Sequence, residues 1–247
     1  MNKEVRESDI SLFFSKTLYY FPLILVETVK LGLSWVTWPL TYLVMYALSL
    51  FIKVNVTYED PDLSSIKRPL IIISNHRKIF DPWYISFAIP FGTLFGKIFP
   101  LRPYSTLHIS KKNVLGYFIL KSMRMIKLTY FIYNTIQVPE NASFDEKISP
   151  IVTALRKKQS ILFFPEGRLS LDDSISDFKK GIVRIQQLSG AQILPVAIRY
   201  DKGVYVSVGK PITIPKELIE NHDSDEFQAA RNFLREKVLD LYSKTKK

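Results

Sequence analysis

At residues 74–82 the chain reads Ser-Asn-His-Arg-Lys-Ile-Phe-Asp-Pro, directly after the run Pro-Leu-Ile-Ile-Ile at residues 69–73. The short apolar and β-branched run predicts a buried strand. Asp81 followed by Pro82 predicts the start of a helix, with Asp81 as the N-cap and Pro82 at the first helical position. His76 therefore lies on a loop that joins a strand to a helix.

This loop holds two side chains that together can move a proton. Asp81 stands where the loop turns, so its carboxylate can fold back onto the imidazole of His76. A carboxylate that holds one ring nitrogen fixes the tautomer and leaves the other nitrogen to accept a proton. On spacing alone, a second interpretation stays open, in which Asp81 only starts the helix and His76 is an ordinary polar loop residue.

The composition limits the class of protein and its partners. The 247 residues suffice for one large α/β domain or two small ones, and 47% of them are hydrophobic, so a sizeable core can form. The formal net charge of +11 favours anionic partners such as phosphate esters, nucleic acid or an acidic membrane surface. We expect no nucleic-acid partner, because no known reader motif is present. We expect no metal site, because cysteine is absent and the three histidines are widely spaced.

Residues 1–52 predict a membrane anchor. Residues 1–9 are polar and no signal-peptide pattern follows them, whereas residues 10–52 are heavily apolar and aromatic, with Pro22 and Pro39 as interruptions. We expect two helices that lie in one leaflet, with Trp and Tyr at the depth of the interface. A single membrane span and a pair of ordinary core helices fit the same residues as alternatives.

Residues 53–247 predict an α/β domain with a mixed, largely parallel sheet covered by helices, because strand and helix patterns alternate along them. The expected strands are 54–58, 69–73, 130–138, 160–164, 193–198 and 204–208. The expected helices begin at 82 and cover 113–128, 144–157, 178–189 and 225–243.

The window from 82 to 139 has an unusual charge pattern, because it contains no Asp or Glu. Such a basic tract favours a surface that meets lipid headgroups or a phosphorylated substrate. Its basic residues are Lys97, Arg102, Lys111, Lys112, Lys121, Arg124 and Lys127.

A second candidate site follows the expected strand at 160–164, where the chain continues Pro165-Glu166-Gly167-Arg168. Glycine tolerates positive φ and lets a ligand approach the backbone. A guanidinium beside such a turn can hold a phosphate with two hydrogen bonds. Taken alone, the stretch also fits an ordinary strand-end turn.

Together these stretches resemble the glycerolipid acyltransferase family, specifically the 1-acylglycerol-3-phosphate acyltransferases, over roughly residues 53–215. The family's H-x4-D block corresponds to residues 76–81, preceded by the expected Asn75, and its F-P-E-G block corresponds to residues 164–167. Residues 194–198 look like its final apolar-Pro-apolar block. All three blocks have the family's order and separation.

The resemblance implies transfer of a fatty acyl group from acyl-CoA or acyl-carrier protein to the sn-2 hydroxyl of lysophosphatidic acid, without a cofactor. It also implies a membrane-associated enzyme of phospholipid biosynthesis, which we expect on the cytoplasmic face of the cell membrane. The roles that it implies are general base for His76, orientation of that base for Asp81, shaping of the acceptor turn for Glu166 and Gly167, and phosphate binding for Arg168.

Two departures from the family pattern concern the acceptor. Arg168 follows Gly167 directly, where the family usually has a Thr between them, and residues 131–134 lack the Arg that usually ends another block. We therefore expect a second phosphate-binding cation from Lys111 and Lys112. Another lysophospholipid, such as lysophosphatidylethanolamine, is the alternative acceptor. An alternative from a different class is a non-catalytic peripheral membrane-binding protein.

Overall fold

The structure is a computed structural model that describes residues 3–106, 125–138, 141–170, 174–220 and 227–245. Within these residues, seven strands form one sheet in the order β1-β7-β6-β2-β5-β3-β4. Every neighbouring pair is parallel except β6 and β7, so the expected mixed, largely parallel sheet is confirmed. The strands are β1 (Val54–Tyr58), β2 (Leu70–Ser74), β3 (Leu101–Thr106), β4 (Ile136–Val138), β5 (Ser160–Phe163), β6 (Gln192–Tyr200) and β7 (Val204–Val208).

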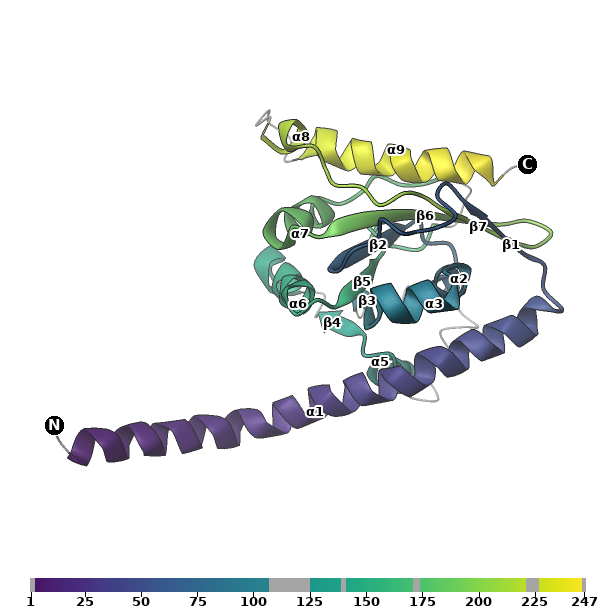
Figure 1. The fold of residues 1–247 in the computed structure, drawn as a ribbon. Helices are drawn as coiled ribbons and strands as arrows, with labels where there is room; N and C mark the ends of the chain where they lie inside the picture. The colour runs from purple at the N-terminus through teal and green to yellow at the C-terminus, as the bar shows by residue number, and fades with distance from the viewer. Residues whose placement is uncertain (1–2, 107–124, 139–140, 171–173, 221–226, 246–247) are drawn as a thin grey trace.

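Helices cover both faces of this sheet, as Figure 1 shows. The helices are α1 (Lys3–Ser49), α2 (Asp81–Ala88), α3 (Phe91–Thr93), the π-helix η1 (Leu94–Ile98), α5 (Met125–Ile132), α6 (Phe144–Arg156), α7 (Gly181–Ser189), α8 (Lys216–Glu220) and α9 (Gln228–Lys244).

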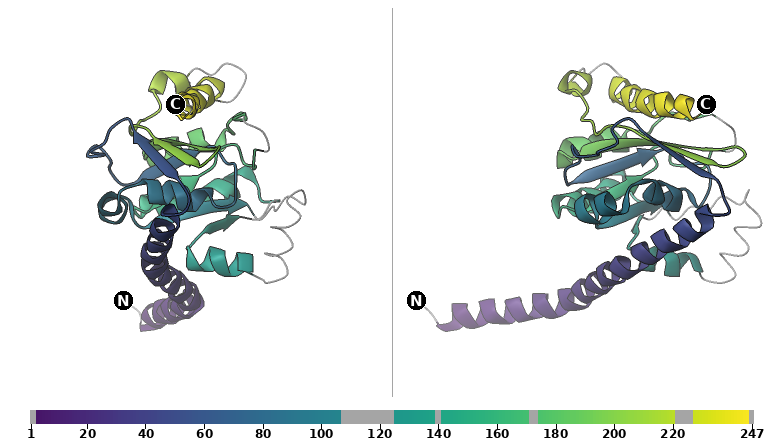
Figure 2. Two further views of the ribbon diagram at one scale, coloured as in Figure 1. Left: turned by 90° about the vertical axis from the view of Figure 1, so that its right-hand side faces the viewer. Right: turned by 45° about the vertical axis from the view of Figure 1, so that its right-hand side comes forward.

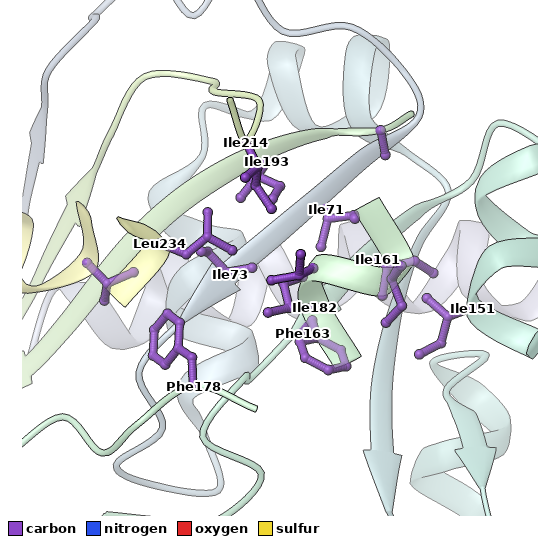
Figure 3. Close-up of a cluster of buried hydrophobic side chains, with 14 of the residues drawn as sticks. Ile71, Ile73, Ile151, Ile161, Phe163, Phe178, Ile182, Ile193, Ile214 and Leu234 are labelled. Carbon is purple, nitrogen blue, oxygen red and sulfur yellow. The ribbon is translucent and has the colours of Figure 1, made fainter. Parts of the chain in front are cut away.

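Strand β2 contributes to a separate apolar core on each face of the sheet, because its side chains alternate. Ile71 and Ile73 pack with residues of α6, α7 and α9, as Figure 3 shows for Ile151, Ile182 and Leu234. Leu70 and Ile72 pack with residues of α1, α2 and η1 on the opposite face. A strand buried on both faces must be apolar throughout, which is why its sequence could be recognised.

Local signals set the ends of the helices on the first face. The side chain of Ser143 and that of Glu146 form a capping box at the start of α6, with Glu146 N donating to Ser143 Oγ. Helix α7 ends at Gly190, which has a left-handed φ of 63°. The helices expected at 144–157, 178–189 and 225–243 are confirmed as α6, α7 and α9, with small shifts at their ends.

Two expectations near the middle of the chain were wrong. Residues 130–138 are not one strand, because Met125–Ile132 forms α5 and only Ile136–Val138 forms β4. A nearly continuous apolar run does not distinguish a buried helix from a strand. Strand β3 was not expected at all, since Pro103 in its interior weakens the strand pattern.

The expected pair of N-terminal helices is also wrong. Residues Lys3–Ser49 form one continuous helix, α1, which runs through both Pro22 and Pro39. Proline removes one backbone hydrogen bond from a helix interior, which weakens and bends a helix but does not always end it. The amino-terminal half of α1 projects beyond the rest of the molecule (Figure 2).

Helix α1 contacts the domain through one narrow stripe. Ser34, Trp38 and Met45 are buried, and the Thr37 hydroxyl donates to the Ile132 carbonyl at 3.2 Å. Within the described residues, Leu25–Ser49 is long and apolar enough to cross a membrane by length and composition, and 17% of its most apolar window is buried. Most of its apolar surface is therefore left uncovered by the protein.

Candidate active site

His76 and Asp81 meet at the edge of the sheet where β2 ends. Strand β2 ends at Ser74, the chain loops through residues 75–80, and α2 begins at Asp81. His76 Nδ1 lies 2.9 Å from Asp81 Oδ2. The side chain of Asp81 is fully buried, whereas that of His76 keeps 21% of its surface exposed. A partly exposed imidazole that is held by a buried carboxylate can present its second nitrogen, Nε2, to a substrate.

Asp81 is not the N-cap that we expected. Phe80 occupies that position without a side-chain cap, and Asp81 is the first residue of α2. Its carboxylate turns back into the loop, where Oδ2 accepts hydrogen bonds from the Arg77 and Lys78 backbone amides at 2.5 and 2.8 Å. These amides satisfy a buried charge that would otherwise be very costly, and they hold Oδ2 beside His76.

Glu166, three residues after β5, connects the two candidate loops. Glu166 is 2% exposed, and its Oε1 accepts a hydrogen bond from the His76 backbone amide at 2.9 Å. Its Oε2 accepts hydrogen bonds from the Ser170 hydroxyl at 2.7 Å and the Ser176 amide at 2.8 Å. Glu166 is therefore a buried link, because its hydrogen bonds join the loop at His76 to the segment that follows β5.

The imidazole of His76 also rests on an aromatic ring. The ring of Phe164 stacks against it with centroids 3.9 Å apart and an interplanar angle of 15°. The Ser170 amide donates to the His76 carbonyl at 2.7 Å. The residues that follow β5 thus fix both the ring and the backbone of His76.

Gly167 and Arg168 form the turn beside this link. Gly167 has φ +68°, a backbone conformation that favours glycine, and the end of the Lys179 side chain lies directly beside it. Arg168 is exposed, and its Nη2 donates to the Ser176 hydroxyl at 3.1 Å. Lys179 also has an exposed side chain, so two cations flank this turn.

Lys111 and Lys112 lie outside the described residues, as do Arg124 and most of the helix expected at 113–128. Near residues 131–134, which lack the family's Arg, Arg102 of β3 donates to the Asn134 carbonyl at 2.8 Å. Arg102 also pairs with Glu27 of α1 at 3.4 Å, and burial lowers its pKa. Its guanidinium ties α1 to the sheet.

Two residues of the site make contacts that no local sequence pattern predicts. Tyr200, at the end of β6, donates its hydroxyl to Asp81 Oδ1 at 2.5 Å across a separation of 119 residues. Asn75 joins the ends of β2 and β6, because its amide donates to the Ile198 carbonyl and accepts from the Ile198 amide, each at 2.9 Å. Asn75 was noted only as part of a family block, and no local pattern singles out Tyr200.

Fold and site together define a class: α/β proteins with a histidine–carboxylate pair where the central strands of a mostly parallel sheet end. Among the described residues there is no group of three or more His, Asp or Glu that could hold a metal ion. The chain belongs to the acyltransferase family, because the model of that family matches residues 55–199, which include His76, Asp81 and Glu166.

Similar proteins include several 1-acyl-sn-glycerol-3-phosphate acyltransferases. The one from Limnanthes douglasii is 25% identical over 156 residues, which are 60% of this chain and 49% of that protein. A probable one from Mycoplasma genitalium is 24% identical over 132 residues, which are 53% of this chain and 44% of that protein. The matched region thus spans about half the length of these relatives.

A solved structure shares the fold. The crystal structure of the 1-acyl-sn-glycerophosphate (LPA) acyltransferase PlsC from Thermotoga maritima matches 99% of both chains, with a TM-score of 0.54 and 16% identity. At that identity the match shows a common fold.

Proposed function

We propose that this protein transfers a fatty acyl group from a thioester to the sn-2 hydroxyl of 1-acylglycerol-3-phosphate, which yields phosphatidic acid. The observation that carries the proposal is the 2.9 Å contact between His76 Nδ1 and the fully buried Asp81 carboxylate. Membership in the acyltransferase family and relatives named as 1-acyl-sn-glycerol-3-phosphate acyltransferases support the reaction and the acceptor.

The proposed reaction needs no acyl-enzyme, because the acceptor alcohol is the nucleophile. His76 Nε2 takes the hydroxyl proton as the oxygen attacks the thioester carbonyl carbon. Asp81 stabilises the imidazolium that forms, as the carboxylate of a catalytic triad does. The C–S bond then breaks, and the thiolate leaves with the proton from His76. A chain without cysteine suits this direct transfer.

We assign the acceptor phosphate to the turn at Gly167. Arg168 offers a planar guanidinium on this turn, and Lys179 offers an ammonium beside it. Gly167 directly follows Glu166, the buried link to the His76 backbone. Lys111 and Lys112, which lie outside the described residues, remain predicted contributors to the same phosphate site.

We further propose that the acceptor arrives from a membrane. The side chains of Ile79 and Phe80, between His76 and Asp81, are 53% and 50% exposed although they are large and apolar. Exposed apolar side chains next to a site mark a surface that meets another apolar phase. We expect the cytoplasmic face of an anionic membrane, where the +11 charge favours binding and where acyl-CoA and acyl-carrier protein are available.

Aromatic contacts place this loop on the same side of the molecule as α1. We call Phe80, Trp83, Tyr133 and Trp38 the aromatic row. Neighbouring rings in it have centroids 5.1, 6.2 and 5.0 Å apart in that order. The row leads from the catalytic loop to the buried stripe of α1, so the exposed face of α1 and the loop can contact one bilayer.

The test is thiol release from an acyl-CoA or acyl-carrier-protein thioester by the full chain in liposomes. We expect release with lysophosphatidic acid as acceptor and little with lysophosphatidylethanolamine. Arg168→Ala should raise the KM for lysophosphatidic acid about tenfold, the effect of one lost charge-assisted contact, with kcat less affected. Absence of release with every acceptor and donor would overturn the proposal and favour a membrane-binding protein without catalysis.

A second acceptor class is favoured by one observation. Residues 131–134 provide no Arg, and Arg102 nearby is held by Asn134 and Glu27. With fewer cations for the phosphate monoester, a lysophospholipid with a larger headgroup would be used better. Release only with lysophosphatidylethanolamine, unchanged in Arg168→Ala, would identify this second class.

A further inference from the structure

The two carboxylate oxygens of Asp81 accept hydrogen bonds from different parts of the chain, and Tyr200 donates to one of them. Oδ2 accepts from His76 Nδ1 and from the Arg77 and Lys78 backbone amides. Oδ1 accepts from the Tyr200 hydroxyl, which comes from β6 rather than from the catalytic loop. The backbone amides therefore fix where the carboxylate lies, while Tyr200 takes up part of its negative charge.

The ring of Tyr200 is itself held in place. The Lys78 ammonium lies 4.0 Å from its centroid, and the ring of Tyr84 contacts it edge-on at 6.0 Å. Cation–π and edge-to-face contacts of this kind favour one orientation of a ring. Burial and the Asp81 charge raise the pKa of Tyr200 far above its usual range, so its hydroxyl stays a donor throughout the working pH range.

We propose that Tyr200 is a positioning residue of the catalytic pair. Its hydrogen bond to Asp81 Oδ1 reduces the electrostatic stabilisation that this carboxylate gives to protonated His76. The proposal rests on the function proposed above. A carboxylate relieved of part of its charge stabilises an imidazolium less. Removal of this hydrogen bond should therefore strengthen the interaction of Asp81 with protonated His76.

Other charged and titratable groups face the pair from every side. They are the Arg77 and Lys78 side chains on the loop, Tyr84 on α2 and Glu166 after β5. A Tyr200→Phe substitution leaves all of them and both backbone amides in place. The difference between this variant and the wild type therefore reports the one hydrogen bond.

The first experiment measures kcat/KM for acyl transfer against pH in wild type and Tyr200→Phe. We expect the acid limb of the profile to move up, by at most about one pH unit, because only the part of this hydrogen-bond energy that differs between neutral and protonated His76 acts on the limb. The variant should then be up to about tenfold slower on the acid limb and within about twofold of wild type on the alkaline plateau.

Tyr58→Phe is the matched control. The Tyr58 hydroxyl donates to the Ala88 carbonyl at 2.5 Å, so it also reaches from the sheet to α2, but at the far end of that helix. This control should lose some stability and keep the acid limb of the wild type. If Tyr200→Phe loses activity equally at every pH, as a merely structural residue would, the proposal is overturned.

A second measurement separates this proposal from the proposed function. NMR of histidine-labelled protein follows the His76 ring directly, with its signal assigned by its loss in His76→Ala. We expect its titration midpoint to move up, by at most about one unit, in Tyr200→Phe, whether or not acyl transfer occurs. An unmoved midpoint overturns the role of Tyr200, whereas a wild type without transfer overturns the function alone.

If Tyr200→Phe does not fold, 3-fluorotyrosine in place of Tyr200 provides the test. Its more acidic hydroxyl donates a stronger hydrogen bond and keeps the shape of the ring. We expect the acid limb and the His76 titration midpoint to move down, by a few tenths of a unit. Movement of either readout upward would contradict the proposal.

Discussion

Two regions of the molecule differ in how they are held: the sheet edge at His76, and helix α1. At the edge, buried carboxylates bind backbone amides: Asp81 accepts from the loop before α2, and Glu166 accepts from the His76 amide. Within Leu25–Ser49, helix α1 instead contacts the domain through a stripe that includes Trp38 and leaves most of its apolar side chains exposed. The sheet edge therefore has a fixed geometry, whereas this part of α1 presents the apolar surface that we propose contacts a membrane.

Removal of the imidazole should give the largest effect and should leave α1 untouched. We expect His76→Ala to lower kcat by roughly 10²–10⁴-fold, because a general base contributes that much. Liposome binding should stay at the wild-type level in a flotation assay, since the exposed apolar residues remain. A variant that retains full transferase activity would refute the role of His76.

Substitutions on α1 should have the converse effect: they should weaken membrane binding and leave the chemistry at His76 intact. We expect the triple variant Leu40→Ser, Leu43→Ser and Val44→Ser to weaken liposome binding on the order of 10²-fold, because each side chain would lose apolar burial in lipid. These residues are 57%, 62% and 49% exposed. Transfer to a short-chain acceptor dissolved in water should persist.

Leu188→Ser serves as the control for that triple variant. Leu188 is 41% exposed and lies on α7, which covers the opposite face of the sheet. It should leave liposome binding unchanged. Equal losses in the control and the triple variant would show that α1 is not a special contact surface.

A smaller effect tests whether the buried link after β5 holds the geometry. Glu166→Gln replaces one accepting oxygen with an amide group that faces donors, so we expect a loss of about 2 kcal/mol in the free energy of unfolding. Turnover should fall about tenfold, because the His76 backbone shifts. Urea unfolding and kcat measure the two effects, and a stable variant with normal turnover would contradict the link.

The smallest effect concerns a surface ion pair between Glu59, which follows β1, and Lys244 at the end of α9. Partial burial would raise the pKa of Glu59, but hydrogen bonds and charges from Lys244 and Lys210 bring it below its usual value. A carboxylate with a lowered pKa stabilises the fold above its unfolded-state pKa and loses that contribution as pH falls through the folded-state value.

Glu59→Gln should therefore destabilise the protein at pH 7 by less than about 1 kcal/mol, because the pair is partly exposed. At pH 3 the difference from wild type should shrink toward zero. Urea unfolding at both pH values measures it, and a difference that is larger at pH 3 would reverse the assigned sign.

The sequence predicted those parts of the molecule whose cause is local. Strand β2 is apolar on both faces and α6 begins with a capping serine, so each could be recognised from a few neighbouring residues. His76 and Asp81 could be paired for the same reason, because a short loop joins them. Only the length and the turn of that loop determine whether the two side chains come into contact.

What the sequence could not predict depends on distant partners. The contact of Tyr200 with Asp81 exists because β6 pairs with β2 in a particular register, which no local pattern shows. Helix α1 continues through Pro39, although a proline pattern predicts a break, and β3 forms despite Pro103 because β5 pairs with it. In these cases tertiary packing outweighed local preference.

Asn75 gives the site a property beyond geometry. Its amide group pairs with both backbone groups of Ile198, so it acts as one more rung of the sheet after the backbone of β2 has turned away. Opening of the catalytic loop at Asn75 must break this rung, which adjoins the central pairing of β2 and β6. We therefore expect hydrogen exchange of the Ile198 amide to be nearly as slow as that of the central strands.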